Sequence, residues 1–400
     1  MRAFGSDPPV NPTRDLATAT RCAANPRLLL VGPLPPPLDG TSVSFELLCQ
    51  EISRARPDIA VRVVDSSGKR LKHEGSALTP GDGLRALRVI ALVCAHIWRS
   101  DRVVLFGSNG FLARMAPPIT GLARLARTPC YVRPFGGSLA EFCEELPPAR
   151  RERLLAVLRR CDGVIVQTRL LQERLAEATG RSVAYLPGYR RILPGAEDRS
   201  DARGRDGDLR LVFLGHVREE KGVGVLLESL RDLKAQGVPV RCDFFGPIYG
   251  GAAEQLEAQL RETGAARYCG ILPQHELWST LANYDALVLP TFYQGEGHPG
   301  VLIEAMIAGL PIVTTRFRCL PELVEDGVNG LLVPPRDAKA LIAALRTLAG
   351  DRDRLRRMAK ASRARGPDFD VRNILPRFLD MVQLGSRGSE MTSAHSDTAP

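Results

Sequence analysis

Several signals that place a chain in a common class are missing from this sequence. Its nine cysteines are scattered, odd in number and never spaced as CxxC, which argues against a disulfide framework and against a zinc site. No apolar run reaches the roughly 18 residues that a membrane-spanning helix needs. The first 26 residues lack the apolar core of a signal peptide. We therefore expect a cytoplasmic protein, not integral to a membrane, with reduced and mostly buried thiols.

Features of nucleic-acid-binding proteins are also absent. There is no zinc-finger spacing and no basic stripe interleaved with aromatic residues. The chain is nevertheless basic, with a formal net charge of +9. A positive balance suits anionic partners, and nucleotide diphosphates or phospholipid headgroups fit it better than nucleic acid does. We therefore expect no nucleic-acid partner.

What is present is an alternation of strands and helices that runs twice. At 400 residues the chain is long enough for two or three domains. A polar, charged segment without periodicity separates the two runs and marks a linker. The sequence thus predicts an α/β protein with two Rossmann-like parallel-sheet domains facing a cleft. The expected parts are a flexible arm (1–26), an N-terminal domain (27–192), the linker (193–208), a C-terminal domain (209–366), a helix crossing back to the first domain (367–384) and a disordered tail (385–400).

The most informative stretch is Leu287–Val313, in the second run. An apolar segment stops at Pro290 and a glycine-rich loop follows. A helix begins near Gly300, and a second apolar segment opens after Pro311. This pattern indicates one βαβ unit whose loop lies at the carboxyl edge of its sheet.

Two carboxylates bracket this loop and helix, Glu296 and Glu304, with seven residues between them. The start of the helix leaves backbone N–H groups without intrahelical partners, which favours an anion. A long ligand with a diphosphate in its middle and hydroxyls at both ends, such as a nucleotide sugar, fits this layout. The alternative is that Glu304 is an exposed helix residue and Glu296 a loop acid near the positive end of the helix dipole. The amides in question belong to Gly297, His298, Gly300 and Val301.

The same loop admits an oxidoreductase interpretation. Gly295, Gly297 and Gly300 spell GxGxxG between a strand and a helix. Arg316 ends the next strand, where an NADP enzyme could place a partner for the 2′-phosphate. Position argues against this interpretation, because the fingerprint normally occupies the first strand–helix turn of its domain. Here at least two strand–helix units of the C-terminal half come before it.

The N-terminal half offers fewer chemical signals. Arg27–Val31 reads as the first strand, and Gly40 lies before the helical run 43–52, where a glycine lets the backbone approach a ligand closely. A simple turn glycine is the alternative there. Leu84–Trp98 reads as a helix that combines arginines with an apolar run. Such a helix is compatible with contact to an anionic membrane and with a core helix whose arginines face solvent.

With these features in place, the chain resembles the GT-B-fold glycosyltransferases. Specifically, it is similar to family 4, the retaining group 1 transferases that assemble bacterial glycans. The resemblance covers most of the chain and is stronger in the C-terminal half. Its most specific element is the pair Glu296 and Glu304 within EGHPGVLIEAMIAGLPIV, followed by FLGHVREEKG (Phe213–Gly222) and by Pro321–Glu322.

The resemblance implies transfer of a hexosyl-type residue, with retention, from a UDP- or GDP-sugar to an acceptor hydroxyl of a glycan or lipid-linked glycan. It implies polysaccharide or glycolipid assembly without a metal or a bound cofactor. The basic N-terminal half is consistent with peripheral contact with the inner face of an anionic membrane. The N-terminal domain becomes the acceptor side and the C-terminal domain the nucleotide-sugar side. By this resemblance Glu296 contacts the sugar hydroxyls and Glu304 contacts the ribose. The diphosphate is bound by Lys221, by Arg218 and by the amides of Gly297, His298, Gly300 and Val301. The backbone around Ile271 and Leu272 contacts the base, and Gly40 closes over the donor from the other domain.

Three positions depart from the family pattern. His216 stands where the family usually has an arginine after the loop glycine, and it joins Arg218 among the expected donor contacts. Phe135, in RPFGGSL, replaces a histidine common in the glycine loop of the N-terminal domain, which leaves a histidine-dependent step in doubt. Asp39–Gly40 replaces a Gly-Gly pair. A nucleotide-sugar-binding protein that has lost transfer therefore stands as an alternative to the enzyme.

A last motif lies in the linker. Asp206–Gly207–Asp208 mimics the DxD metal motif of other sugar transferases. Because the linker is solvated and brings no neighbouring ligands, we expect this motif to hold no metal.

Overall fold

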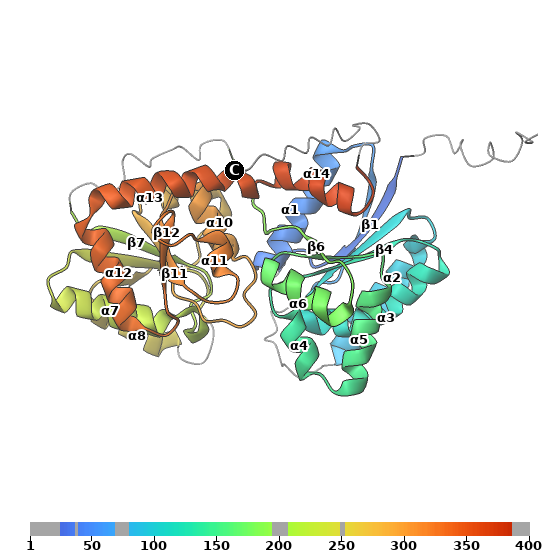
Figure 1. Cartoon of the computed structure of the whole chain (residues 1–400), viewed down its shortest axis with the longest axis horizontal. Coiled ribbons are helices and arrows are strands. Elements are labelled where there is room, and N and C mark those ends of the chain that lie inside the picture. Colours follow the sequence, from blue (N-terminus) through green and yellow to red (C-terminus); the bar gives the residue numbers. More distant parts are fainter. Residues whose placement is uncertain (1–24, 37–38, 69–79, 194–206, 249–252, 386–400) are drawn as a thin grey trace, which may run out of the picture.

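The computed structural model has two domains, each built around one parallel sheet flanked by helices (Figure 1). It describes residues 25–36, 39–68, 80–193, 207–248 and 253–385. The arm, the linker and the tail expected from the sequence lie almost wholly outside these ranges. The predicted α/β class, with two Rossmann-like domains, is confirmed.

The N-terminal domain is built on a six-stranded sheet in the order β2-β1-β3-β4-β5-β6, and neighbouring strands are parallel. Its elements are β1 (Arg27–Gly32), α1 (Gly40–Ala55), β2 (Ala60–Asp65), α2 (Pro80–Ile97), β3 (Arg102–Gly107), α3 (Asn109–Leu125), β4 (Cys130–Pro134), α4 (Leu139–Glu145), α5 (Pro148–Arg160), β5 (Gly163–Val166), α6 (Arg169–Thr179) and β6 (Ala184–Tyr185).

The C-terminal domain has a six-stranded sheet in the order β12-β11-β10-β7-β8-β9, again with parallel neighbours. Its elements are β7 (Leu209–Leu214), η2 (Glu219–Lys221), α7 (Val223–Ala235), β8 (Val240–Phe245), α8 (Ala253–Thr263), β9 (Ala266–Tyr268), η3 (Gln274–Glu276), α9 (Leu277–Leu281), β10 (Ala286–Leu289), α10 (Gly300–Ile307), β11 (Ile312–Thr315), α11 (Leu320–Leu323), β12 (Gly330–Val333), α12 (Ala338–Gly350), α13 (Arg352–Arg365), η4 (Gly366–Phe369) and α14 (Val371–Met381).

Strand β1 shows how the sequence builds the first core. Because successive side chains of a strand point to opposite faces, its continuous apolar run must be covered on both sides. Leu28 and Leu30 pack with residues of α1 and α14, whereas Leu29 and Val31 pack with residues of α2, α3 and α5. All four leucine and valine side chains are fully buried. Helices therefore cover both faces of this sheet.

The strand order in both sheets reverses next to the first strand of the domain. β1 lies between β2 and β3, and β7 lies between β8 and β10. Ligands of open α/β sheets bind beyond the carboxyl ends of the strands at such switch points. Gly40 follows β1, Lys221 follows β7 and Glu296 follows β10. Three expected site residues thus lie at the two switch points.

The chain crosses between the domains twice, and the two crossings lie side by side. The N–H of Arg190 donates to the carbonyl of Phe369 at 2.9 Å, and the carbonyl of Arg190 accepts from the N–H of Val371 at 2.8 Å. α14 begins directly after the second crossing and packs against α1 (Figure 1). Its Ile374 and Phe378 join the core of the N-terminal domain. The last helix of the chain therefore completes the first domain.

One boundary near the expected site differs from the sequence expectation. The helical run expected at 43–52 begins at Gly40, because Asp39 caps it. The Asp39 carboxylate accepts from the N–H groups of Thr41 at 2.8 Å and Ser42 at 2.7 Å, and the Ser42 hydroxyl accepts from the N–H of Asp39. Gly40 is thus a helix residue and not a loop glycine. The first turn of α1 is already supplied with a carboxylate, so it is no open anion site.

The carboxyl edges of the two sheets meet through backbone. The N–H of Gly137, after β4, points to the carbonyl of Gly295 at 3.4 Å. A Cβ atom at Gly136 would lie 2.8 Å from that carbonyl, and one at Gly137 would lie 2.2 Å from the carbonyl of Glu296. Gly136 also has a φ of 79°, which disfavours any side chain. Glycine is therefore required at both positions for the domains to come this close.

Replacing Gly137 by alanine should weaken this contact, because the added methyl group overlaps the backbone of Glu296. The expected cost to the closed arrangement is about 1–3 kcal/mol, the range for overpacking. Small-angle X-ray scattering should then give a larger radius of gyration for Gly137→Ala than for the wild type. Gly121→Ala is the matched control, because nothing lies within 4 Å of the added atom there. Superimposable curves for Gly137→Ala and wild type would contradict the contact.

Candidate active site between the two domains

The two carboxylates expected from the sequence are both buried. Glu296 and Glu304 expose 5% and 8% of their surface. Glu304 lies on α10, whose residues from Leu302 to Ile307 are all buried. The alternative in which Glu304 is an exposed helix residue is therefore wrong. A buried carboxylate requires a partner of opposite charge, and each of these two has one.

Glu296 is paired with Lys221. The Lys221 Nζ lies 2.7 Å from Oε1 and 2.8 Å from Oε2 of Glu296. Lys221 ends the short turn η2 after β7, and Glu296 follows β10, which is the strand next to β7. The sheet topology thus joins two residues that are 75 positions apart. An ammonium group has three N–H donors, so one remains for a further acceptor.

Tyr293 joins this pair to a second cation. The Arg218 guanidinium lies 4.4 Å from the centroid of the Tyr293 ring, and the Lys221 Nζ lies 5.0 Å from it. Within the described part of the chain, the buried Nε of Arg218 has no hydrogen-bond partner. It lies 3.8 Å from the carboxylate of Glu220. Tyr293 therefore places Arg218 beside the Glu296–Lys221 pair. The sequence did not single out this tyrosine.

Glu304 is paired with Arg190, which reaches it from the crossing between the domains. The Arg190 Nε donates to Glu304 Oε1 at 2.6 Å. Its Nη1 donates to the Ser44 hydroxyl on α1 at 2.8 Å. The guanidinium is almost wholly buried. No motif marks the segment after β6, so no signal in the sequence pointed to this residue.

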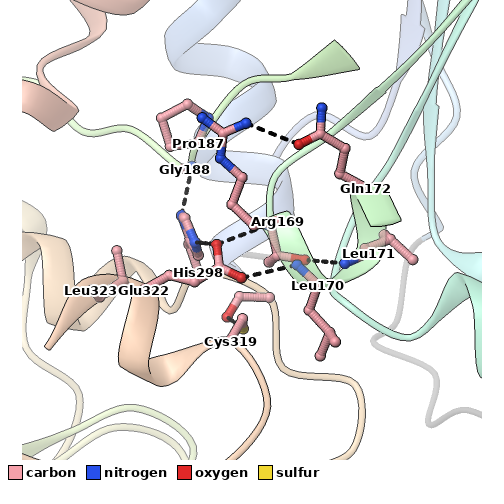
Figure 2. Close-up of polar contacts among 12 residues, drawn as sticks. Arg169, Leu170, Leu171, Gln172, Pro187, Gly188, His298, Cys319, Glu322 and Leu323 are labelled. Carbon is pink, nitrogen blue, oxygen red and sulfur yellow. Dashed lines mark hydrogen bonds and ion pairs between the residues drawn. The ribbon is translucent and has the colours of Figure 1, made fainter. Parts of the chain in front are cut away.

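His298 binds to the N-terminal domain through its side chain (Figure 2). The N–H of Gly188 donates to Nδ1 of His298 at 3.3 Å, and Nε2 lies 3.1 Å from the carboxylate of Glu322. Because Nδ1 accepts a hydrogen bond, Nε2 carries the proton and donates to Glu322. His298 was expected to contribute its backbone amide, and this side-chain role was not predicted from the sequence.

Glu322, on α11, caps a helix of the other domain. Its Oε2 accepts from the N–H of Arg169 at 2.8 Å, and its Oε1 accepts from the N–H of Leu170 at 3.1 Å. These are the first residues of α6, which Thr168 also caps at the N–H of Leu171. Figure 2 shows the Glu322 carboxylate between His298 and the start of this helix. A carboxylate at a helix N-terminus is favoured by the helix dipole.

The other expected donor contacts are more open. His216 is half-buried in the loop after β7. Ile271 is 68% exposed after the edge strand β9, and Leu272 beside it is half-buried. The loops after β8 and β9 are joined by a bond from the N–H of Gly246 to the carbonyl of Gly270 at 2.8 Å. Within the described ranges, no hydrogen bond or ion pair joins Ile271 or Leu272 to the two buried acids.

Phe135 contributes no polar group to the site. Its ring centroid lies 5.9 Å from that of Phe106. It packs against the core formed by β1, α1 and α14. The side chain at this departure from the family pattern therefore supports the N-terminal domain.

Within the described residues, histidine, cysteine and acidic side chains form no group of three that could hold a metal ion. Asp206 of the acidic motif lies outside those residues, and Asp208 is exposed. None of the described helices combines the length and the apolar character needed to cross a membrane.

Solved structures are similar to this chain over most of its length. The Anabaena protein Alr3699/HepE, solved in complex with UDP, has a TM-score of 0.68 and 18% identity, covering 89% of this chain and 99% of that one. A sucrose-phosphate synthase from Thermosynechococcus elongatus gives 0.69 and 15%, covering 90% and 98%. At such identities the likeness shows the fold alone. The chain has the GT-B fold.

The C-terminal part of the chain matches a known family. Residues 196–365 match the family described as glycosyl transferases group 1. That range contains Lys221, Glu296 and Glu304. The C-terminal domain therefore matches the group 1 glycosyltransferases, and the resemblance drawn from the sequence is confirmed at this level.

Curated relatives are similar over parts of their length. An amylovoran biosynthesis glycosyltransferase of Erwinia amylovora is 35% identical over 35% of this chain and 36% of its own. A GDP-mannose-dependent phosphatidylinositol monomannoside mannosyltransferase of Mycolicibacterium smegmatis is 29% identical over 74% of this chain and 79% of its own. The first five curated relatives match this chain over only 36% to 56% of their own length.

The contact between Glu322 and α6 predicts a pH-dependent stability. Burial raises the pKa of the Glu322 carboxyl, but hydrogen bonds from His298 and from the N–H groups of Arg169 and Leu170 outweigh it, so the pKa lies below its ordinary value of 4.5. A lowered pKa stabilises the folded protein above the ordinary value, and this stabilisation is lost as the pH falls through the folded value.

Glu322→Gln should therefore lower the free energy of unfolding at pH 7 by about 1–3 kcal/mol, the cost of losing hydrogen bonds to a charged group. The difference from wild type should shrink as the pH falls below the ordinary pKa of 4.5 and should vanish below the lower folded value, where the wild-type carboxylate is also protonated. Urea unfolding at a series of pH values measures it. Glu152→Gln, at a side chain that is 66% exposed, is the control. A difference that stays constant down to pH 3 would contradict the assignment.

Proposed function

We propose that this protein is a retaining glycosyltransferase that moves a hexosyl-type residue from a UDP- or GDP-sugar to an acceptor hydroxyl. The observation that carries the proposal is the buried Glu296–Lys221 pair. It lies at the switch point of the C-terminal sheet, beside the start of α10, and faces the carboxyl edge of the N-terminal sheet. Carboxylates that can bind hydroxyl groups and cations that can bind phosphate thus lie at one site. The group 1 match over the same residues supports it.

The proposed donor lies along the β10–α10 unit. Glu296 orients the hydroxyls of the sugar, and Glu304 binds the ribose through its Oε2, since Oε1 already accepts from Arg190. Lys221 has one N–H left for the diphosphate. The amides at the start of α10 face the same group, because the first N–H groups of a helix have no intrahelical partner.

In the proposed reaction the bond between the anomeric carbon and the diphosphate oxygen breaks as the acceptor oxygen bonds to that carbon. The bonding pair leaves with the diphosphate, and the acceptor proton passes to the departing oxygen. The growing negative charge is stabilised by Lys221, Arg218 and the α10 amides, which are held in place beforehand. These groups supply the charge that a divalent metal supplies in other transferases, so no metal takes part. Glu296 is proposed as an orienting group and not as a nucleophile.

The acceptor is proposed to be a growing glycan or a lipid-linked glycan, and the protein to work in the cytoplasm. The curated relatives support a role in polysaccharide or glycolipid assembly through what their names state of them. The relative from Erwinia amylovora is named for amylovoran biosynthesis, and the one from Mycolicibacterium smegmatis for a phosphatidylinositol mannoside.

Lys221→Ala tests the electrostatic part of the proposal. Loss of the ammonium should remove about 2–4 kcal/mol of transition-state stabilisation, by analogy with a lost oxyanion donor. That corresponds to a fall of roughly 30- to 800-fold in kcat/KM. Lys339→Ala, at an exposed lysine of α12, is the control. A Lys221→Ala variant that folds and keeps wild-type kcat/KM would contradict the role.

A non-catalytic nucleotide-sugar-binding protein is the second candidate. It is favoured by Phe135, whose ring packs into the core where the family carries a histidine, and by His216 in place of an arginine. A turnover assay over a panel of nucleotide sugars separates the candidates. Tight binding without release of nucleoside diphosphate would support the binding protein.

The oxidoreductase interpretation loses support from the topology. GxGxxG follows β10, the fourth strand of its domain, whereas a dinucleotide fingerprint follows the first. Saturation-transfer NMR with NADPH against UDP- and GDP-sugars decides between them directly.

We also propose peripheral contact with an anionic membrane through α2 and α3. Leu84 and Leu87 on α2 are 72% and 67% exposed, and Leu125 at the end of α3 is 69% exposed. Trp98, directly after α2, is 56% exposed. The hydroxyl of Thr128 donates to the carbonyl of Ile97, which holds the ends of the two helices together. Arginines accompany these side chains at positions 85, 88, 99, 124 and 127, as a monotopic surface requires.

Vesicle co-sedimentation tests this surface. The protein should pellet with vesicles that contain anionic lipid at low salt and be released at high salt, because surface charges are screened. Leu84→Gln with Leu87→Gln should lower the partition coefficient about tenfold or more, since burying one leucine is worth about 1.5–3 kcal/mol. Val328→Gln, at an exposed apolar residue of the C-terminal domain, is the control. Equal binding by the double variant and wild type would contradict the surface.

A further inference from the structure

Arg190 is held at a fixed point between the domains. Its backbone bonds to Phe369 and Val371 tie the first crossing to the second. Its side chain then reaches α10 of one domain through Glu304 and α1 of the other through Ser44. The guanidinium therefore lies between α10 and α1.

One nitrogen of this guanidinium is left over. Nε donates to Glu304, and Nη1 donates to Ser44 and to the carbonyl of Tyr189 at 2.9 Å. Among the residues that the structure describes, Nη2 has no acceptor. An arginine has five N–H donors, and two of them belong to Nη2. A clamp between the domains needs only Nε and Nη1.

Nη2 points to the place where the two helices begin. A Cβ atom at Gly300, the first residue of α10, would lie 1.5 Å from Nη2. One at Gly40, the first residue of α1, would lie 4.0 Å from it. Pro299 before α10 offers no side-chain cap, unlike Asp39 before α1. The open nitrogen and the positive end of α10 thus lie together, and an anion that contacts both would relieve their repulsion.

The length of the proposed donor places its diphosphate at this point. With the sugar at Glu296 and the ribose at Glu304, the phosphates lie along residues 297–301. His216 does not supply the arginine that the family has beside the diphosphate. A guanidinium matches phosphate oxygens with a planar fork that a lone ammonium lacks.

We infer that Arg190 binds the diphosphate of the donor through Nη2 and supplies the positive charge that His216 does not. This inference rests on the proposed function. It assigns two roles to one side chain: Nε holds the Glu304 carboxylate in place for the ribose, and Nη2 contacts the leaving group. The two segments that cross between the domains then lie beside the diphosphate, whose negative charge grows during the reaction.

Calorimetric titration with UDP, GDP, UMP and GMP tests the inference. Wild type should prefer the diphosphate of its base over the monophosphate. Arg190→Gln should lose about ten- to hundredfold in diphosphate affinity, the worth of hydrogen bonds to a charged group, with a much smaller change for the monophosphate. Arg191→Gln is the matched control, because the neighbouring arginine pairs with Glu51 on α1 at 2.5 Å. It should keep the wild-type preference.

Arg190→Lys covers the case in which the glutamine variant does not fold. It keeps the charge and loses the fork, so its diphosphate preference should fall between those of glutamine and wild type. Either folded variant with an unchanged preference for diphosphate would overturn the inference while leaving the proposed function standing. Failure of wild type to bind any of the four nucleotides would overturn the proposed function, and this inference with it.

Discussion

The carboxyl edges of the two sheets meet through two loops. Both loops have glycine at the point of contact. A single methyl group on Gly137 would overlap the carbonyl of Glu296. The short distance between the domains therefore depends on glycine, which has no side chain. From this contact follows the rest of the site: the loop that carries Glu296 is pressed against the first domain, and the crossing that carries Arg190 reaches α10.

Charged side chains make direct contacts between the two domains. Glu304 and Glu322 each bind a group of the first domain, and Glu296 binds Lys221 within its own. Removing one partner of a buried ion pair typically costs about 3–5 kcal/mol, so these contacts specify one arrangement of the domains. Polar groups can also exchange a protein partner for a ligand or water. A contact of this kind is suited to opening for a polar donor and closing around it.

Much of the fold followed from local pattern, and the site followed only in part. The βαβ unit around Glu296 and Glu304 was readable because apolar runs, glycines and acids lie close together in the sequence. α3 was not foreseen, because Pro117–Pro118 interrupts its helical pattern. Arg190 was missed because its partner Glu304 is 114 positions away and no motif links them. Tertiary pairs of this kind become visible only when the two crossings are placed side by side.

A crystal structure of the protein soaked with a hydrolysis-resistant UDP- or GDP-sugar tests the central claim most directly. The account predicts one extended ligand along β10–α10, with its sugar at Glu296, its ribose at Glu304 and its diphosphate between Lys221 and the first residues of α10. A ligand bound on another face, or with its phosphates away from α10, would contradict it.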